Sequence, residues 1–342
     1  MGAGGMAAGG TATSGGGGSG GDVCEHTSYP EPPKDHDLGG EQEFVVAMNS
    51  IGLGETLETR VGVDLDRECT CLGEGPSCVA PPNAGDNECD FDGGVDSNFS
   101  RLMTLLAAFS SGTISSSAYS QGALDGRWSV LLRVRGYNGA VDDDQVEVAV
   151  FTTPGFPPDE VPLWDGTDEW PIASTSVGAS GSTEEPKFVS LSGYVRDGIL
   201  VAPLPSLPLI FNTGFSYLPF DITGGFIMGT IVEQAGETAL TNGLIAGRFT
   251  MESMFQSLSE FRNGAGMPIC RGDSYYDSVK ILVCNLRDIS SEVPGPGASC
   301  DSISMGVGFT AQPAKLGAVG DNLAPSPGCP AETTPATDSC PD

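Results

Sequence analysis

The fold class is decided by residues 127–152, which read RWSVLLRVRGYNGAVDDDQVEVAVFT. Apolar side chains occupy every second position from Trp128 to Val134 and again from Val146 to Val150. A period of two gives a strand one apolar face, which is buried against a core. The loop at 136–144 joins the two runs as a hairpin. This stretch therefore predicts two neighbouring strands that share one core-facing side.

The same kind of pattern recurs along the rest of the chain. An Asp-Gly turn at 197–198 between β-rich flanks predicts a second hairpin. Apolar residues at helical spacing predict three helices, which begin at Asn98, Thr250 and Ser274. Further strands are expected at 44–48, 215–223, 226–232, 244–249 and 303–309. We therefore expect a mainly β protein with a β-sandwich or jelly-roll-like body and about three short helices over one end or edge.

The chain is strongly acidic. Its 342 residues include 15 Lys and Arg against 45 Asp and Glu, which gives a formal charge of −30. Such a charge repels nucleic-acid phosphates, so we expect no nucleic-acid partner, and it argues against docking on an anionic membrane. No uninterrupted apolar run approaches the roughly 18 residues that span a bilayer, so no transmembrane span is expected either.

Ten cysteines, an even number, lie in loop-like surroundings. Such a set predicts disulfides, which form in an oxidising compartment, so we expect a disulfide-linked protein outside the cell or in the cell envelope. A zinc site is the alternative for four of them, although their spacing C-x-C-x6-C-x10-C lacks the paired C-x2-C of zinc ribbons. The cysteines are Cys24, Cys69, Cys71, Cys78, Cys89, Cys270, Cys284, Cys300, Cys329 and Cys340.

The two ends of the chain differ in composition from its middle. Residues 1–40 combine a Gly/Ser tract with a Pro-rich stretch, which predicts a flexible tether, and 323–342 form a Pro-rich tail. The cysteines predict export, yet the first residues lack the basic and apolar regions of a signal peptide. We therefore expect that the true start of the chain, with its signal, or a lipid-bearing cysteine lies upstream of Met1. The globular domain is expected at 41–322, with a Cys/Asp-rich part at 41–97, a sheet body at 98–249, and helices and the last strand at 250–322.

Histidine is nearly absent, because only His26 and His36 occur and both lie in the N-terminal region. A Ser-His-Asp or Cys-His mechanism needs a histidine within the folded body of the protein. No G-x-S-x-G, S-x-x-K, H-E-x-x-H or Walker motif occurs in the sequence. An enzyme built on this chain would therefore depend on carboxylates, and a role without catalysis is the preferred hypothesis.

Two acidic, cysteine-rich stretches predict a calcium site. They read GVDLDRECTC at 62–71 and CDFDGGVDSN at 89–98. Ca²⁺ takes roughly six to eight oxygen ligands from a turning backbone, and D-x-D-G-G-x-D supplies carboxylates with glycines where the chain bends. The alternative is that these aspartates are ordinary turn residues. The predicted ligands of a structural calcium ion are Asp64, Asp66, Asp90, Asp92 and Asp96.

A second candidate site is the loop PLWDGTDEWP at 162–171. Indole rings that stack on sugar faces, beside carboxylates that accept sugar hydroxyls, are typical of carbohydrate sites. The same carboxylates would suit glycoside hydrolysis. In the alternative interpretation both tryptophans fix the loop to the core. The predicted ligand-binding residues are Trp164, Asp165, Asp168, Glu169 and Trp170.

Several features occur together between about Val23 and Gly317. Besides the Gly/Ser tether, they are G-V-D-L-D-x-x-C-T-C, S-C, C-D-x-D-G-G-V-D-x-N, W-D-G-T-D-x-W and G-x-I-A-G-R-F. In these motifs the chain resembles uncharacterised envelope lipoprotein-like proteins of myxobacteria. The resemblance implies export and a lipid anchor. It implies no activity and no catalytic residue.

These observations lead to one functional hypothesis and two alternatives. We expect an exported cell-surface binding or interaction module with a structural calcium site, and with a glycan or a cell-surface protein as its partner. The alternatives are a carboxylate-dependent polysaccharide hydrolase and an envelope scaffold without a ligand. A hydrolase needs two carboxyl groups about 5 to 9.5 Å apart across a cleft, whereas a glycan-binding surface needs exposed rings.

Overall fold

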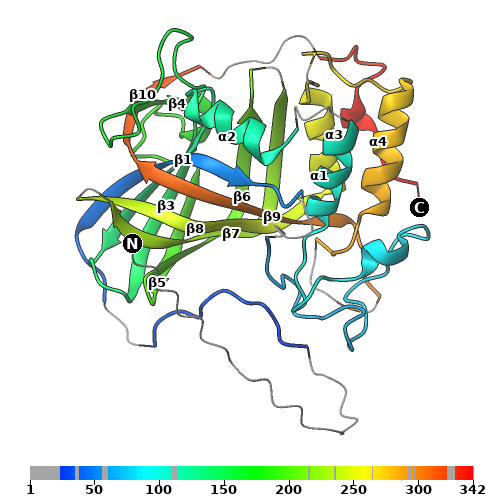
Figure 1. Ribbon diagram of the computed structural model, residues 1–342, viewed down its shortest axis with the longest axis horizontal. Helices are drawn as coiled ribbons and strands as arrows, with labels where there is room; N and C mark the ends of the chain where they lie inside the picture. Colours follow the sequence, from blue (N-terminus) through cyan, green and yellow to red (C-terminus); the bar gives the residue numbers. More distant parts are fainter. Residues whose placement is uncertain are drawn as a thin grey trace, which may run out of the picture.

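Eight antiparallel strands form a closed barrel in the computed structural model (Figure 1). Each strand pairs with its neighbours in sequence order, and the first pairs with the last. The strands are β1 (Gln42–Gly52), β2 (Val130–Tyr137), β3 (Asp143–Thr152), β5 (Phe188–Arg196), β6 (Ile199–Asn212), β7 (Tyr217–Gln234), β8 (Glu237–Thr250) and β9 (Ser302–Pro313). The structure describes residues 24–34, 38–55, 61–109, 114–214, 216–234, 236–263, 265–291, 295, 297–321 and 328–341.

The hairpin that the sequence predicts is present as β2 and β3. Val130 pairs with Thr152 and Val134 with Val148, so the alternating apolar residues of both strands share one side. They belong to the main core cluster inside the barrel. The mainly β class is therefore confirmed, and the strands form one closed sheet where a sandwich or jelly roll was expected. Alternation gives each strand one buried face in either arrangement and does not distinguish them.

The outer face of the hairpin is also covered. Leu131, Ala149 and Phe151 point away from the main core and belong to a second apolar cluster. This cluster packs under a small parallel sheet of β4 (Glu169–Ala173) and β10 (Lys315–Gly320). The central strands therefore have apolar residues on both faces.

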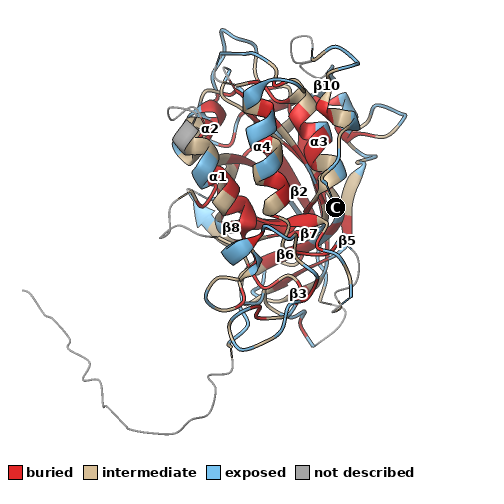
Figure 2. Ribbon diagram, turned by 90° about the vertical axis from the view of Figure 1, so that its right-hand side faces the viewer, coloured by how far each residue is buried: buried red, intermediate tan, exposed pale blue. Residues whose placement is uncertain are grey.

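Three helices lie together at one end of the barrel: α1 (Asn98–Phe109), α3 (Met251–Glu260) and α4 (Ser274–Asn285) (Figure 1). Their faces toward the strands are buried and their opposite faces exposed, as amphipathic spacing requires (Figure 2). The side chain of Thr250 caps α3 by accepting a hydrogen bond from Ser253 N. All three begin at or beside the residues predicted.

A fourth helix, α2 (Ser116–Leu124), packs on β1 and was not predicted. Its buried residues include Tyr119 and Ala123, separated by small and polar ones, so the sequence shows no continuous apolar stripe. Three short 3-10 turns occupy Gly85–Glu88, Ser174–Ser176 and Pro335–Thr337. Within the described residues, every helix falls short of the length and apolar character needed to cross a membrane.

All ten cysteines form disulfides, as the sequence predicted. The chain is therefore suited to an oxidising compartment, and no thiolate is left for a zinc site. One bond joins Cys24 to the loops between β1 and α1, one lies within those loops, one joins them to the segment before β9, and two fix the C-terminal tail. The pairs are Cys24–Cys69, Cys71–Cys89, Cys78–Cys300, Cys270–Cys329 and Cys284–Cys340.

Residues 24–34, here called the N-terminal strap, belong to the folded body. Thr27 N donates to Gly93 O, and the hydroxyl of Tyr194 donates to Pro30 O. The ring of Tyr29 lies 4.5 Å from that of Phe226 on β7. The expected tether at 1–40 is thus too long by at least this strap, and residues 1–23 lie outside the described part.

Candidate functional site

Four of the five predicted calcium ligands come together on the outer side of the barrel, in the loops between β1 and α1. One carboxylate oxygen from each of Asp64, Asp66 and Asp96 lies within 4.8 Å of the others. Asp90 is close enough for its charge to act on Asp96. We call these four residues and Asp288 the carboxylate cluster. Asp288, from the segment between α4 and β9, acts electrostatically on Asp90 and Asp96 and was not predicted.

Backbone pairing brings the two acidic stretches into register. Asp96 N donates to Val63 O, and Leu65 N donates to Asp96 Oδ2 at 2.6 Å. Gly94 has a φ of +67°, and a Cβ there would lie 2.8 Å from Cys69 Sγ and 3.0 Å from Asp64 Oδ2. The second glycine of the D-x-D-G-G motif is therefore required by both its conformation and its neighbours.

The carboxylate oxygens of Asp64, Asp66 and Asp96 accept hydrogen bonds, except for one oxygen of Asp96. Asp64 Oδ1 accepts from Arg67 N, and Asp66 accepts from Glu68 N and from the hydroxyl of Ser77. Asp96 is 1% exposed, and its Oδ1 atom is buried with no hydrogen-bond partner among the described residues. A buried carboxylate oxygen without a partner is costly unless a cation or a proton satisfies it.

Burial and mutual repulsion shift the titration of the cluster. Burial, reinforced by neighbouring carboxylates, raises the pKa of Asp90 to about 8 and that of Asp96 well above its ordinary value. Burial likewise raises the pKa of Asp66, and that of Asp288 to about 7. The guanidinium of Arg248 opposes the shift at Asp66 only in part. These carboxyls therefore keep their protons to a higher pH than usual, because their surroundings supply too little positive charge to hold all of them ionised.

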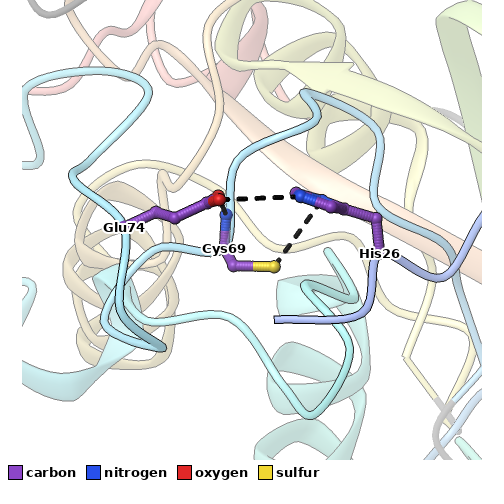
Figure 3. Close-up of side chains that lie close together, drawn as sticks. All are labelled: His26, Cys69 and Glu74. Atoms are coloured by element: carbon purple, nitrogen blue, oxygen red, sulfur yellow. Dashed lines mark hydrogen bonds and ion pairs between the residues drawn. The ribbon is translucent and has the colours of Figure 1, made fainter. Parts of the chain in front are cut away.

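The strap places His26 beside Cys69 and Glu74 (Figure 3) and in contact with Asp64 of the carboxylate cluster. His26 Nδ1 contacts Asp64 Oδ2, and His26 Nε2 lies 3.6 Å from Glu74 Oε1. The hydrogen bond to Asp64 raises the pKa of His26. Cys69 Sγ is 3.6 Å from the ring, but its disulfide with Cys24 removes it as a metal ligand. His26 and Glu74 were not predicted as site residues.

Asp92, the fifth predicted ligand, does not belong to the cluster. Its side chain is exposed, whereas Asp64, Asp66 and Asp96 are buried. The turn formed by Gly93 and Gly94 separates it from Asp96. The structure therefore does not bring Asp92 together with the other predicted ligands.

The tryptophan loop does not expose both of the indole rings that the predicted glycan site would use. Trp170 is completely buried in the second core cluster, where Phe156 and Trp164 pack on its ring at 4.7 and 5.3 Å. Asp168 accepts hydrogen bonds from the backbone N atoms of residues 163 and 164, so its carboxylate closes the loop. Asp165 accepts from Thr167 in the same way.

What remains of that loop on the surface offers little to a sugar. Trp164 is half-buried, and its Nε1 donates to Leu124 O at 3.3 Å. Glu169 is exposed at the start of β4. Trp170 has no free ring face for stacking, so the interpretation in which the indoles fix the loop to the core describes this region.

A cavity of about 580 Å³ lies between the strap, the loop at 64–67 and strands β7 and β8, and Asp64 is the one carboxylate of the cluster among its lining residues. Arg67 and Arg248 also line it. Comparisons with known protein families, curated proteins and solved structures give no match. The likeness to envelope lipoprotein-like proteins therefore stays a prediction from the motifs.

Proposed function

We propose that the protein is an exported binding module whose cysteine-rich loops are organised by a bound calcium ion. The observation that carries this proposal is the buried, unpartnered Oδ1 of Asp96 beside Asp64 and Asp66. A proton or a cation can satisfy such an oxygen, and the described side chains around the cluster offer it neither a donor nor a positive charge within hydrogen-bond distance. A divalent cation would satisfy Asp96 and reduce the repulsion within the cluster.

Calcium is favoured among cations by the ligand chemistry. Every cluster member offers hard oxygens, and Ca²⁺ prefers such ligands from flexible loops with several carboxylates. No cysteine thiolate is free to select zinc, because all ten are in disulfides. Modules outside the cell bind calcium with dissociation constants of about 10⁻⁴ to 10⁻³ M, which suits an exported disulfide-linked chain. The ion would be structural, since Asp66 and Asp96 are buried.

Binding is favoured over polysaccharide hydrolysis by the placement of the carboxylates. Asp66, Asp90, Asp96 and Asp288 do not line the adjacent cavity. A glycosidase needs one carboxyl on each side of the bond that it cleaves, with access to substrate. Buried carboxylates gathered on one side suit a cation better than an acid and base pair. A cell-surface or envelope position follows from the disulfides together with the resemblance to lipoprotein-like proteins.

Calorimetric titration of the chelator-stripped chain with CaCl₂ tests the proposal. We expect one Ca²⁺ to bind, with Mg²⁺ and Zn²⁺ weaker. Asp96→Asn should abolish binding, because it keeps the shape of the side chain and removes its charge. Asp92→Asn is the matched control, in the same loop but exposed, and should bind calcium normally.

Because Asp96→Asn changes a buried position, its folding is checked by circular dichroism, and Asp66→Asn provides a second disruption. If wild-type protein binds no divalent cation, or if Asp96→Asn and Asp92→Asn bind Ca²⁺ alike, the proposal is wrong.

A further inference from the structure

The cavity beside the cluster contains an unusual share of the positive charge of this chain. Only 15 of its 342 residues are Lys or Arg, yet Arg67 and Arg248 both line the cavity. His26 stands at the same wall. In a protein with a formal charge of −30, these two guanidinium groups offset the carboxylates of Asp64 and Glu31 in the same lining and offer an anion charged hydrogen-bond donors.

The guanidinium groups of Arg67 and Arg248 differ in how firmly the protein holds them. Arg248 is fixed, because it donates to Ser290 O at 2.9 Å and to Leu65 O at 3.2 Å. The side chain of Arg67 is exposed, and no partner for its guanidinium occurs among the described residues. One fixed and one open guanidinium suit a carboxylate, which guanidinium groups bind in two-pronged fashion.

The backbone holds Arg67 in a conformation that ordinary residues avoid. Its φ is +66°, in the left-handed region, and its N–H donates to Asp64 Oδ1 at 2.5 Å. A non-glycine residue in this region costs free energy and persists where surrounding contacts enforce it, often at a binding site. Asp64 therefore connects the carboxylate cluster directly to the position of Arg67.

The rest of the cavity lining provides aromatic rings, a hydroxyl group and a carboxylate. The strap contributes Tyr29, whose ring packs against Phe226 on β7, and both line the cavity. Glu31 and Ser28 line it as well and are exposed. Aromatic surface suits the face of a sugar ring, while a carboxylate and a hydroxyl suit its hydroxyl groups. Glu31 would repel a plain anion that brings no hydrogen-bond donors.

We infer that this cavity binds an acidic sugar, a uronic acid whose carboxylate contacts Arg67 and Arg248 while its ring lies along Tyr29. Its volume of about 580 Å³ falls in the usual range for small-ligand sites, and it accommodates one or two sugar units. The inference rests on the proposed function, because it supplies the ligand class for the proposed binding module. It places the glycan site at the strap and not at the tryptophan loop.

The test is calorimetric or NMR titration of the full calcium-loaded chain with glucuronate, with glucose and acetate as comparison probes. We expect glucuronate to bind at least tenfold more tightly than either probe. Arg67→Ala should weaken glucuronate binding at least tenfold, and Arg67→Lys less. Lys187→Ala removes one exposed positive charge outside the cavity and should leave the affinity unchanged.

The two proposals fail in different ways. Calcium binding without glucuronate binding overturns the acidic-sugar site and leaves the proposed cation site standing. Glucuronate binding that depends on Arg67 in a chain that binds no calcium overturns the cation site alone. Equal affinity for glucose and glucuronate, or an unaltered affinity in Arg67→Ala, refutes the role assigned to the arginines.

Discussion

Removing calcium should destabilise the protein most at neutral pH. The pKa of Asp90 is raised to about 8, that of Asp288 to about 7, and that of Asp96 well above its ordinary value. A carboxyl whose pKa is higher in the folded state binds more protons when folded. Its contribution to stability is complete below the unfolded value of about 4 and is lost as the pH rises through the folded value. The cation-free protein should therefore lose stability between about pH 4 and pH 8.

Carboxyls whose pKa is lowered in the folded protein do not reverse this loss of stability with rising pH. Hydrogen bonds to Arg135 lower the pKa of Glu184, and Asp338, with Lys280 and Tyr276 as partners, also has a lowered pKa despite its burial. Such groups contribute stability above their unfolded pKa, and lose it as the pH falls through the folded one. Their effect is confined to pH values below about 4 to 5. Asp90, Asp96 and Asp288, whose pKa values are raised, therefore dominate the change of stability with pH between pH 5 and pH 8.

The size of the calcium effect follows from linkage. A ligand at a hundred times its dissociation constant, bound only by the folded state, adds about 2.7 kcal/mol. An unfolding entropy of about 2.1 cal/mol/K per residue over roughly 300 folded residues gives on the order of 0.6 kcal/mol/K. The melting temperature in calcium should then exceed that in chelator by about 4 °C at pH 7.5. The difference should shrink at pH 5, where protons compete for the same oxygens.

Differential scanning calorimetry at pH 5, 6.5 and 8, with calcium or with chelator, measures both trends. Asp96→Asn should melt higher than wild type in chelator at pH 8, because it removes a buried charge, and should not respond to calcium. Asp92→Asn should behave like wild type. A melting temperature in chelator that rises from pH 5 to pH 8, or one unaffected by calcium at pH 7.5, would refute the reasoning.

Three further predictions concern stability. Trp170→Ala should cost about 3 to 5 kcal/mol in denaturant unfolding, since it empties a fully buried site, and half-buried Trp164→Ala should cost less; equal losses would contradict this packing. Gly94→Ala should cost about 1 to 2 kcal/mol and weaken calcium binding, whereas Gly75→Ala, with open space around it, should do neither. Replacing the Cys78–Cys300 pair by serine should lower stability more than replacing Cys71–Cys89, because their sequence separations are 222 and 18.

The strands could be predicted because alternation is local, whereas closure of the barrel could not. One strand shows the limit clearly. Residues 200–211 contain three prolines and are interrupted as an apolar run, yet they lie within β6. Proline is excluded from central strands because it lacks a donor, and is tolerated on an unpaired edge. β6 pairs with β5 only at 199–201, so Pro203, Pro205 and Pro208 lie beyond that pairing. Which edge stays unpaired depends on the whole sheet.

For the candidate site too, residues within local motifs could be predicted from the sequence and a distant one could not. Asp64, Asp66, Asp90 and Asp96 could be predicted because they lie in two short stretches with calcium-like spacing. Asp288 could not, since almost two hundred residues separate it from Asp96 and no local motif marks it.

His26 was assigned to a tether because its surroundings are rich in glycine, proline and charge. The disulfide of Cys24, two residues before it, was the signal that this segment is held on the body. The burial of Trp170 could not be predicted for another reason. Residue type does not reveal exposure, and an indole that stacks on a sugar looks the same in sequence as one that fills a core.

The disulfides and the proposed cation both counteract the mutual repulsion of the carboxylate cluster. Five carboxylates gathered with little regular secondary structure repel one another, and hydrogen bonds from turns alone hold them weakly. Cys69 and Cys89 are close in sequence to Asp64 and Asp90, and Cys78 Sγ lies 3.4 Å from the carbonyl oxygen of Asp288. The bonds of these cysteines therefore limit how far the acidic segments can separate in the unfolded chain. A cation then acts on the repulsion that remains in the folded state. The disulfides suit this acidic loop region to an oxidising compartment, and the proposed cation site adds the expectation that this compartment also supplies calcium.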